Sequence, residues 1–137
     1  MASDESAALS RPLEGIFVLI LEDYEDARTL FAALLAMSGA SVTAVANVAD
    51  ALAACDRTRF DVIVSDLNLP EQDGFDFIEI LRSRPLEEGG TTPAIAVTAQ
   101  EEEAYRDRAL TAGFQEFLGK PVDAADLVDV IVRLITK

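Results

Sequence analysis

Three carboxylates in this sequence stand where apolar runs end. Glu22 and Asp23 directly follow residues 16–21, and Asp66 ends a stretch built around the β-branched run 62–64. Carboxylates that are brought together repel one another unless a counter-ion lies between them. An all-oxygen site with room for water suits Mg²⁺. The three acids therefore predict a magnesium site if the fold places them side by side.

A hydroxyl and an ammonium stand at comparable places farther along the chain. Thr98 follows the apolar run 93–97, and Lys120 follows the run 114–118 after one glycine. A compact ammonium can neutralise phosphoryl oxygens, and a threonine hydroxyl can donate a hydrogen bond to one of them. Phosphoryl transfer depends mainly on positioning and charge neutralisation. Together with the acids, these two side chains predict phosphoryl chemistry at this site.

The elements that must position these side chains alternate between two periodicities. Short β-branched apolar runs predict buried strands, and apolar residues three and four positions apart predict helices. Gly39 and Gly113 are expected to end two of the helices, and residues 86–92 to form a loop. The predicted strands are residues 16–21, 41–46, 60–65, 93–97 and 114–118, and the predicted helices begin at Asp26, Asn47, Gly74, Glu101 and Asp123.

Five strands that alternate with five helices on short connections predict an α/β fold. We expect a flavodoxin-like, doubly wound, five-stranded parallel sheet in the order 2-1-3-4-5, with helices on both faces. In this order the first and third strands are neighbours, so their carboxyl ends would bring Glu22, Asp23 and Asp66 together. The fourth and fifth strands would add Thr98 and Lys120 at the same edge of the sheet.

The amino-acid composition argues against binding to nucleic acid or membranes and excludes histidine-based chemistry. The chain has 137 residues, 25 of them acidic and 11 basic, which gives a formal net charge of -14, and it has no histidine. Such a surface repels phosphate backbones and anionic membranes, so we expect no direct binding to nucleic acid or membrane. The absence of histidine excludes histidine-based acid–base catalysis and any role of this chain as a phosphohistidine donor.

The sequence is expected to form one domain in a reducing compartment. Its length suits a single core. Cys55 is the only cysteine, so no intrachain disulfide can form, and a cytoplasmic location is expected. Residues 1–14 are small and acidic, which predicts a disordered tail, and residues 15–137 are expected to form the domain.

Four motifs occur in order along the chain. They are Glu22-Asp23 after a strand, Asp66 with Pro70 and Gly74 at fixed offsets, Thr98-Ala99, and Phe117-Leu118-Gly119-Lys120-Pro121. Together they resemble the receiver domain of two-component response regulators, and the resemblance covers residues 15–137. It implies a phosphorylation-dependent signalling switch, which is not an enzyme beyond assisting its own phosphorylation and dephosphorylation.

The resemblance implies a role for each acid. Asp66 would be the phosphoacceptor, taking a phosphoryl group from a phosphohistidine on a histidine kinase or a histidine phosphotransfer protein. Glu22 and Asp23 would hold Mg²⁺, directly or through water. Asp66 and the backbone carbonyl of Asn68 would complete the protein ligands of the ion.

The resemblance also implies roles for the remaining motif residues. Thr98 and Lys120 would bind the phosphoryl oxygens. Phe117 would be the switch aromatic, which moves inward as Thr98 moves toward the phosphate. The peptide bond between Lys120 and Pro121 would be cis, an isomer largely confined to bonds that precede proline.

Two uncharged amides stand two residues past motif residues. Asn68 follows Asp66, and Gln100 follows Thr98, at this spacing. They would flank the path of an attacking water molecule. We therefore predict that both tune the lifetime of the acyl phosphate.

The output of such a switch is expected to be a change in protein binding. The surface would consist of the last helix, the fifth strand and the helix opened by Glu101. It would bind a downstream protein target or pair with a second copy through the last helix. The sequence fits a single-domain response regulator and also a receiver segment of a hybrid histidine kinase or a larger regulator.

Three other function classes fit less well. A small phosphohydrolase with an Asp nucleophile requires a second carboxylate as general acid two residues farther on, where this sequence has Asn68. A flavodoxin-like cofactor binder needs a phosphate-cradling loop after the first strand, where Glu22-Asp23 would repel a phosphate. A pseudo-receiver that acts without phosphate is disfavoured by the intact acceptor set.

Overall fold

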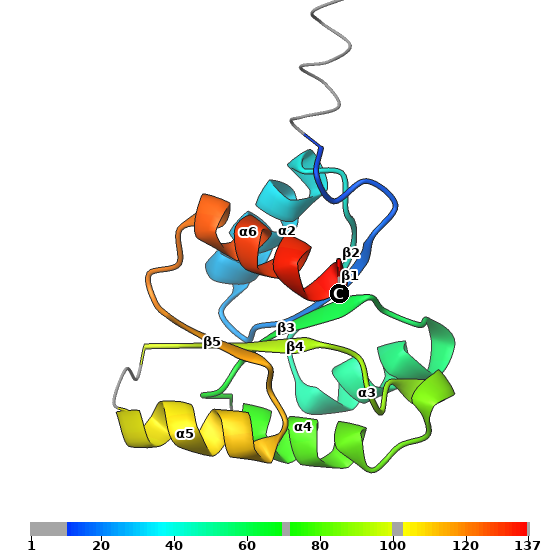
Figure 1. Ribbon diagram of the computed structural model, residues 1–137, viewed down its shortest axis with the longest axis vertical. Helices are drawn as coiled ribbons and strands as arrows, with labels where there is room; N and C mark the ends of the chain where they lie inside the picture. Colours follow the sequence, from blue (N-terminus) through cyan, green and yellow to red (C-terminus); the bar gives the residue numbers. More distant parts are fainter. Residues whose placement is uncertain (1–10, 70–71, 100–102, 137) are drawn as a thin grey trace, which may run out of the picture.

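The computed structural model describes residues 11–69, 72–99 and 103–136. Its centre is a parallel sheet in the order β2-β1-β3-β4-β5 (Figure 1). The predicted fold class and strand order are therefore confirmed. The strands are β1 (Phe17–Leu21), β2 (Ser41–Val45), β3 (Val62–Asp66), β4 (Ala94–Thr98) and β5 (Glu116–Gly119).

Helices cover both faces of the sheet. Two of them, α2 and α6, lie against one face, and α3, α4 and α5 lie against the other (Figure 1). No helix within the described residues is long and apolar enough to cross a membrane. The helices are α2 (Glu25–Met37), α3 (Val48–Arg57), α4 (Gly74–Arg82), the short 3₁₀ helix η1 (Leu86–Glu88), α5 (Glu103–Ala112) and α6 (Ala124–Ile135).

The core consists of two apolar clusters, one on each face of the sheet. All residues of β3 and β4 are buried, as expected for central parallel strands with helices on both sides. Val18 and Ile95 belong to the cluster under α2 and α6, whereas Leu19 and Ile63 belong to the cluster under α3, α4 and α5. Because the strands are packed from both sides, their carboxyl ends occupy fixed positions.

Side-chain caps set where several helices begin. Asn47 Oδ1 accepts the backbone N–H of Asp50 at 2.8 Å, so Asn47 caps α3 at the predicted helix start. In α4, Asp73 and Asp76 form a capping box, each accepting the backbone N–H of the other. Asp123 caps α6 by accepting a backbone N–H two residues farther on. The cap of α4 fixes this helix directly after the loop that leaves β3.

Several predicted boundaries need correction, and the third strand begins at Val62 rather than at residue 60. Residues 86–92, predicted as a loop, include η1, because the carbonyl of Pro85 accepts the N–H groups of Glu88 and Gly90. The last strand begins at Glu116 rather than at residue 114, because the N–H of Phe114 still donates to a carbonyl of α5. The predicted helix start at Glu101 lies outside the described residues.

The segment before β1 also differs from the prediction. Residues 1–10 lie outside the described part of the chain, but residues 11–14 form a turn instead of a disordered tail. Leu13 is fully buried in the cluster under α2 and α6, and its N–H donates to the carbonyl of Ser38 at 2.8 Å. The packed domain therefore begins before Gly15. Leu13 stands between Pro12 and Glu14, without the periodicity that could have revealed its burial.

Candidate functional site

The register of the sheet brings the predicted side chains to one edge. In the β1–β3 pair, the last partners come directly before Glu22 and Asp66. In the β4–β5 pair, Thr98 lies opposite the residue that precedes Lys120. The backbone N–H of Lys120 donates to the carbonyl of Thr98 at 2.8 Å, which extends this register by one residue. Strand pairing thus brings Glu22, Asp66, Thr98 and Lys120 to one edge of the sheet.

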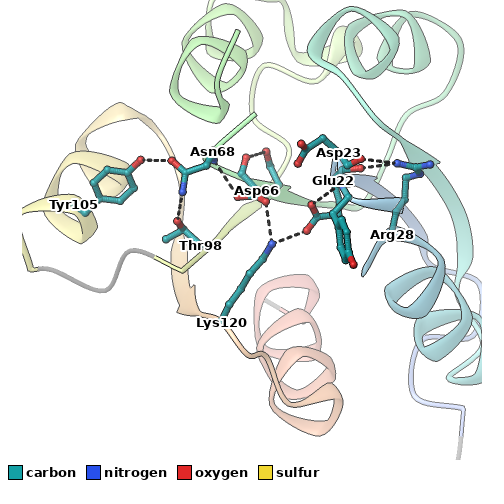
Figure 2. Close-up of polar contacts among 10 residues, drawn as sticks. Glu22, Asp23, Arg28, Asp66, Asn68, Thr98, Tyr105 and Lys120 are labelled. Carbon is teal, nitrogen blue, oxygen red and sulfur yellow. Dashed lines mark hydrogen bonds and ion pairs between the residues drawn. The ribbon is translucent and has the colours of Figure 1, made fainter. Parts of the chain in front are cut away.

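One side of Asp66, here called the charged side, consists of Glu22, Asp23 and Lys120. Lys120 Nζ lies 2.7 Å from Glu22 Oε1 and 2.9 Å from Asp66 Oδ2 (Figure 2). Glu22 and Asp66 are 2% and 7% exposed, whereas Asp23 is exposed. One ammonium is therefore shared by two nearly buried carboxylates.

Burial and the pairing between Glu22 and Lys120 have opposite effects on the pKa of each of these two groups. Burial raises the pKa of Glu22, and the hydrogen bonds from Lys120 and from the N–H of Tyr24 only partly offset this, while the charge of Asp66 adds to it. Burial would lower the pKa of Lys120, but its hydrogen bonds to Glu22 and Asp66 outweigh burial and raise that pKa. Lys120 therefore stays protonated, and the charged side keeps an excess of negative charge.

The backbone of the acidic pair is held from α2. Arg28 Nη1 donates to the carbonyl oxygens of Glu22 at 3.0 Å and of Asp23 at 3.3 Å (Figure 2). The N–H of Tyr24 donates to Glu22 Oε2 at 3.1 Å. These bonds fix the turn after β1 and so fix the direction in which both acids leave the strand.

The donor set of the charged side fits Mg²⁺. One carboxylate oxygen from each of Glu22, Asp23 and Asp66 lies within 4.8 Å of the other two. Ligands of an octahedral Mg²⁺ at about 2.1 Å lie at most about 4.2 Å apart, so a small inward movement would bring all three into range. Exposed Asp23 leaves the site open to water, which Mg²⁺ usually retains as part of its coordination.

The other side of Asp66, here called the neutral side, consists of Asn68, Thr98 and Tyr105. The N–H of Asn68 donates to Asp66 Oδ1 at 3.0 Å. Asn68 Nδ2 donates to Thr98 Oγ1 at 3.0 Å, and the hydroxyl of Tyr105 donates to Asn68 Oδ1 at 3.0 Å (Figure 2). Hydrogen bonds from uncharged donors thus lead from Asp66 to α5.

Gly74 allows α4 to approach the loop that follows Asp66. A Cβ at position 74 would lie 2.4 Å from the carbonyl oxygen of Asp66 and 2.9 Å from the Cα of Leu67. The N–H of Gly74 also donates to the carbonyl of Leu67 at 3.0 Å. Because backbone atoms cannot yield to such contacts, a glycine is required here for the loop to keep its shape.

Comparison with known proteins identifies the family. The sequence matches the family described as the response regulator receiver domain over residues 18–132. The chain belongs to this family. Receiver domains are the phosphorylation-dependent signalling switches of two-component systems, in which they interact with histidine kinases or phosphotransfer proteins.

Solved receiver structures share this fold. The receiver domain of the sensor histidine kinase PA1611 from Pseudomonas aeruginosa is 33% identical, with a TM-score of 0.82 over 90% of this chain and 99% of that one, and its active-site cleft coordinates a magnesium ion. The chemotaxis response regulator CheY4 of Vibrio cholerae is 28% identical, with a TM-score of 0.79 over 87% of this chain and 98% of that one.

Curated relatives of this receiver domain differ widely in length. An uncharacterized 14.6 kDa protein from the sodA1 3′ region of Leptolyngbya boryana is 40% identical over 83% of this chain and 86% of its own length. Hybrid signal transduction histidine kinase D of Dictyostelium discoideum is 34% identical over 91% of this chain but 8% of its own length. RegX3 of Mycobacterium tuberculosis is 35% identical over 81% of this chain and 47% of its own length.

Some of the remaining predicted residues lie within the part of the chain that the structure describes, and others do not. The Lys120–Pro121 peptide bond is cis. Phe117 is buried in the cluster beneath α3, α4 and α5, so its ring points inward. Pro70 and Gln100 lie outside the described residues.

Two residues of the site have no counterpart in the sequence prediction. Arg28 reaches the backbone of the acidic pair, and Tyr105 reaches Asn68 from 37 positions away. Arg28 follows the acidic pair by five and six residues, a spacing that could have suggested contact across one turn of α2. No local signal marks Tyr105, because its bond depends on the packing of α5 against the sheet.

Proposed function

We propose that this receiver domain accepts a phosphoryl group on Asp66, with Mg²⁺ as its cofactor. The observation that carries the proposal is the ion pair between Lys120 and Asp66 beside a cluster of three carboxylates. An acid held against an ammonium and a potential cation site is suited to take on the added negative charge of a phosphoryl group.

The chemistry in this proposal is a transfer followed by hydrolysis. An oxygen of Asp66 attacks the phosphorus of a phosphohistidine, the new O–P bond forms, and the N–P bond breaks, leaving its electron pair on the ring nitrogen of the partner. Lys120 Nζ, 2.9 Å from Asp66 Oδ2, is close enough to pair with the incoming phosphoryl oxygens. Water later attacks the phosphorus and releases inorganic phosphate and the Asp66 carboxylate. Asn68 and Gln100 tune the rate of this second step.

The proposed ligands of Mg²⁺ are Glu22, Asp23, Asp66 and the backbone carbonyl of Asn68. Bound there, the ion would neutralise charge on the carboxylates and on the incoming phosphoryl group. The spacing of the three carboxylates supports this ligand set, as does the magnesium ion in the related Pseudomonas aeruginosa receiver domain.

The proposed switch consists of Thr98 and Phe117. Thr98 is fully buried beside Asn68, and a short movement of its hydroxyl toward Asp66 would let it donate to a phosphoryl oxygen. Phe117 is proposed as the switch aromatic, whose buried, inward position is favoured when Thr98 moves toward the phosphate. The output surface in this proposal is α5, β5 and α6, which would bind a downstream protein or a second copy of the chain.

The proposed docking site for the phosphodonor lies beside Lys120. The surface beside this lysine is a groove between α2 and the segment after β5, along which a donor would approach Asp66. Exposed apolar side chains beside a reactive group fit an amphipathic helix of a histidine kinase or phosphotransfer protein. A cytoplasmic location remains part of the proposal. The groove is lined by Tyr24, Ala27, Leu30, Phe31, Lys120, Pro121 and Val122.

Acetyl phosphate and Mg²⁺ test the acceptor. Incubation should add the mass of one phosphate to the wild type and none to Asp66→Asn. Asp107→Asn, which changes an exposed acid on α5, is the matched control and should be labelled like the wild type. Equal labelling of Asp66→Asn, or no labelling of a folded wild type, would contradict the proposal.

Leu30→Glu tests the docking groove separately. Leu30 is 56% exposed, so the charge should not disturb folding. Transfer from a phosphorylated phosphotransfer protein that labels the wild type should slow at least about tenfold, because a charge would be buried against an apolar partner. Labelling by acetyl phosphate should be unchanged. Equal transfer rates for the two proteins would rule out this groove.

A further inference from the structure

Tyr105 connects helix α5 to the residue that follows the proposed acceptor strand. Its hydroxyl donates to Asn68 Oδ1 at 3.0 Å, and the amide nitrogen of the same side chain donates to Thr98 Oγ1 at 3.0 Å (Figure 2). A single planar amide therefore bridges a helix on the surface and a fully buried threonine. Since an amide has fixed geometry, the positions of the two hydroxyl groups depend on each other.

The ring of Tyr105 is held independently of its hydroxyl. It meets the ring of Phe75 edge to face, with centroids 5.3 Å apart and planes at 77°. Phe75 is buried at the start of α4. The guanidinium of Arg108, which belongs to α5, lies 3.9 Å from the centroid of the Phe75 ring. Asn68, by contrast, is exposed, so hydrogen bonds rather than packing hold its side chain.

We propose that the Tyr105 hydroxyl is a positioning group that favours the unphosphorylated arrangement of Thr98. This inference rests on the proposed function, in which the Thr98 hydroxyl moves to a phosphoryl oxygen. That movement breaks the bond between Asn68 Nδ2 and Thr98 Oγ1. Any bond that holds Asn68 in its present place therefore opposes phosphoryl binding, and by linkage phosphoryl binding weakens the hold of Asn68 on Tyr105.

Through this coupling, the hydrogen bonding of Tyr105 on α5 depends on whether the site holds a phosphoryl group. When Thr98 leaves the amide, Asn68 loses one of the bonds that orient it, and the environment of the Tyr105 hydroxyl changes. Loss of one neutral hydrogen bond corresponds to a change of about two- to tenfold in an equilibrium constant. Tyr105 thus biases the switch without touching the phosphoryl group.

Beryllofluoride, a phosphoryl analogue that is not hydrolysed, tests the inference at equilibrium. In saturating Mg²⁺, calorimetric titration should show about two- to tenfold tighter binding to Tyr105→Phe than to the wild type, since the ring is kept and only the hydroxyl is lost. Asn68→Ala should also bind more tightly, and the double variant should gain no more than the stronger single variant. Ser83→Ala is the matched control, because it also loses a single hydroxyl, which donates to the carbonyl of Ile80 away from the site, and it should bind like the wild type.

A spectroscopic readout separates coupling from a purely structural role. The chain has two tyrosines and no tryptophan, so in Tyr24→Phe the tyrosine fluorescence comes from Tyr105 alone. Beryllofluoride should change that fluorescence, and the change should disappear when Asn68→Ala is added.

The measurements distinguish failure of the Tyr105 inference from failure of the proposed function. Unchanged or weaker binding by Tyr105→Phe and Asn68→Ala, or a fluorescence change that persists without Asn68, would overturn the inference even if Tyr105→Phe lowers stability. Failure of the wild type to bind beryllofluoride would instead overturn the proposed function.

Discussion

The two sides of Asp66 hold it by different kinds of bonds. On the charged side, Lys120 pairs at 2.7 and 2.9 Å with carboxylates that are nearly buried. On the neutral side, the backbone N–H of Asn68 donates to Asp66, and two hydrogen bonds of 3.0 Å between uncharged groups join the exposed side chain of Asn68 to Thr98 and Tyr105. Charge-assisted bonds in a buried setting are strong and costly to break, whereas neutral bonds exchange at low cost. The comparison indicates that the charged side binds and the neutral side rearranges.

Lys120→Met should have the largest effect, because it removes the only cation paired with the two carboxylates of the charged side within the described residues. Phosphorylation by acetyl phosphate should slow about 100-fold or more, since the phosphoryl oxygens lose a positioned positive charge. Mg²⁺ should bind about tenfold more tightly, because a competing cation is gone. Labelling rates and Mg²⁺ titration measure these changes, with Arg133→Met on α6 as the control. Wild-type labelling together with weaker Mg²⁺ binding would break the assignment of Lys120 to the charged side.

Gly74→Ala should disturb both sides at once, because the added Cβ would push against the carbonyl of Asp66. We expect the free energy of unfolding to fall by about 2–4 kcal/mol, measured by urea denaturation. Gly15→Ala is the control, since a Cβ there meets nothing within 4 Å and only its positive φ of 79° is strained. It should cost about 1 kcal/mol. Equal losses for the two variants would show that the loop after β3 is not closely packed.

Glu22→Gln should change how the free energy of unfolding depends on pH, because Glu22 has a raised pKa on the charged side. Burial raises the pKa of Glu22 in the folded protein above the unfolded value near 4.5, so the native state takes up a proton first as pH falls. The wild type without metal should therefore gain stability relative to Glu22→Gln as pH falls through that native pKa, and the gain should level off below 4.5. Lys120 contributes no slope in this range, because its raised pKa matters only above about 10.5.

Urea denaturation of both proteins in EDTA, at a series of pH values, measures this difference. A wild type that loses stability relative to the variant on acidification would mean that the pairing with Lys120 outweighs burial and lowers the pKa of Glu22 in the folded protein.

Asn68→Ala should have the smallest effect on folding, because the side chain is exposed. We expect a change of less than about 1 kcal/mol in the free energy of unfolding. The acyl phosphate should be hydrolysed about two- to fivefold faster, since removing the amide opens the path of the attacking water. Loss of label after removal of acetyl phosphate measures the rate, with Gln72→Ala in the same loop as the control. An unchanged rate would show that the neutral side does not control hydrolysis.

The charged side could be predicted from the sequence because strand order determines it. Once residues 16–21 and 60–65 are assigned as strands and given the order 2-1-3-4-5, Glu22 and Asp66 must meet. Lys120 joins them because β5 lies two strands from β3 at the same edge. The whole sheet follows from the same apolar runs, with boundaries correct to within two residues.

The neutral side could be predicted only in part. Asn68 and Thr98 stand near motif positions, but their direct bond depends on side-chain conformation. Tyr105 lies on a helix whose position is set by packing on Phe75, which no pattern in the sequence encodes. Leu13 shows the same limit, since an isolated apolar residue gives no periodic signal of its burial. Contacts between elements, rather than the elements themselves, are what the sequence left undetermined.

The most direct test of the central claim is to locate the phosphoryl group chemically. Borohydride reduces an acyl phosphate on aspartate to homoserine, which tandem mass spectrometry of peptides can place in the sequence. After treatment with acetyl phosphate and Mg²⁺, homoserine should occur at position 66 and should be absent when Mg²⁺ is withheld with EDTA. Homoserine at another acid, or at position 66 to the same extent without Mg²⁺, would contradict a metal-assisted acceptor at Asp66.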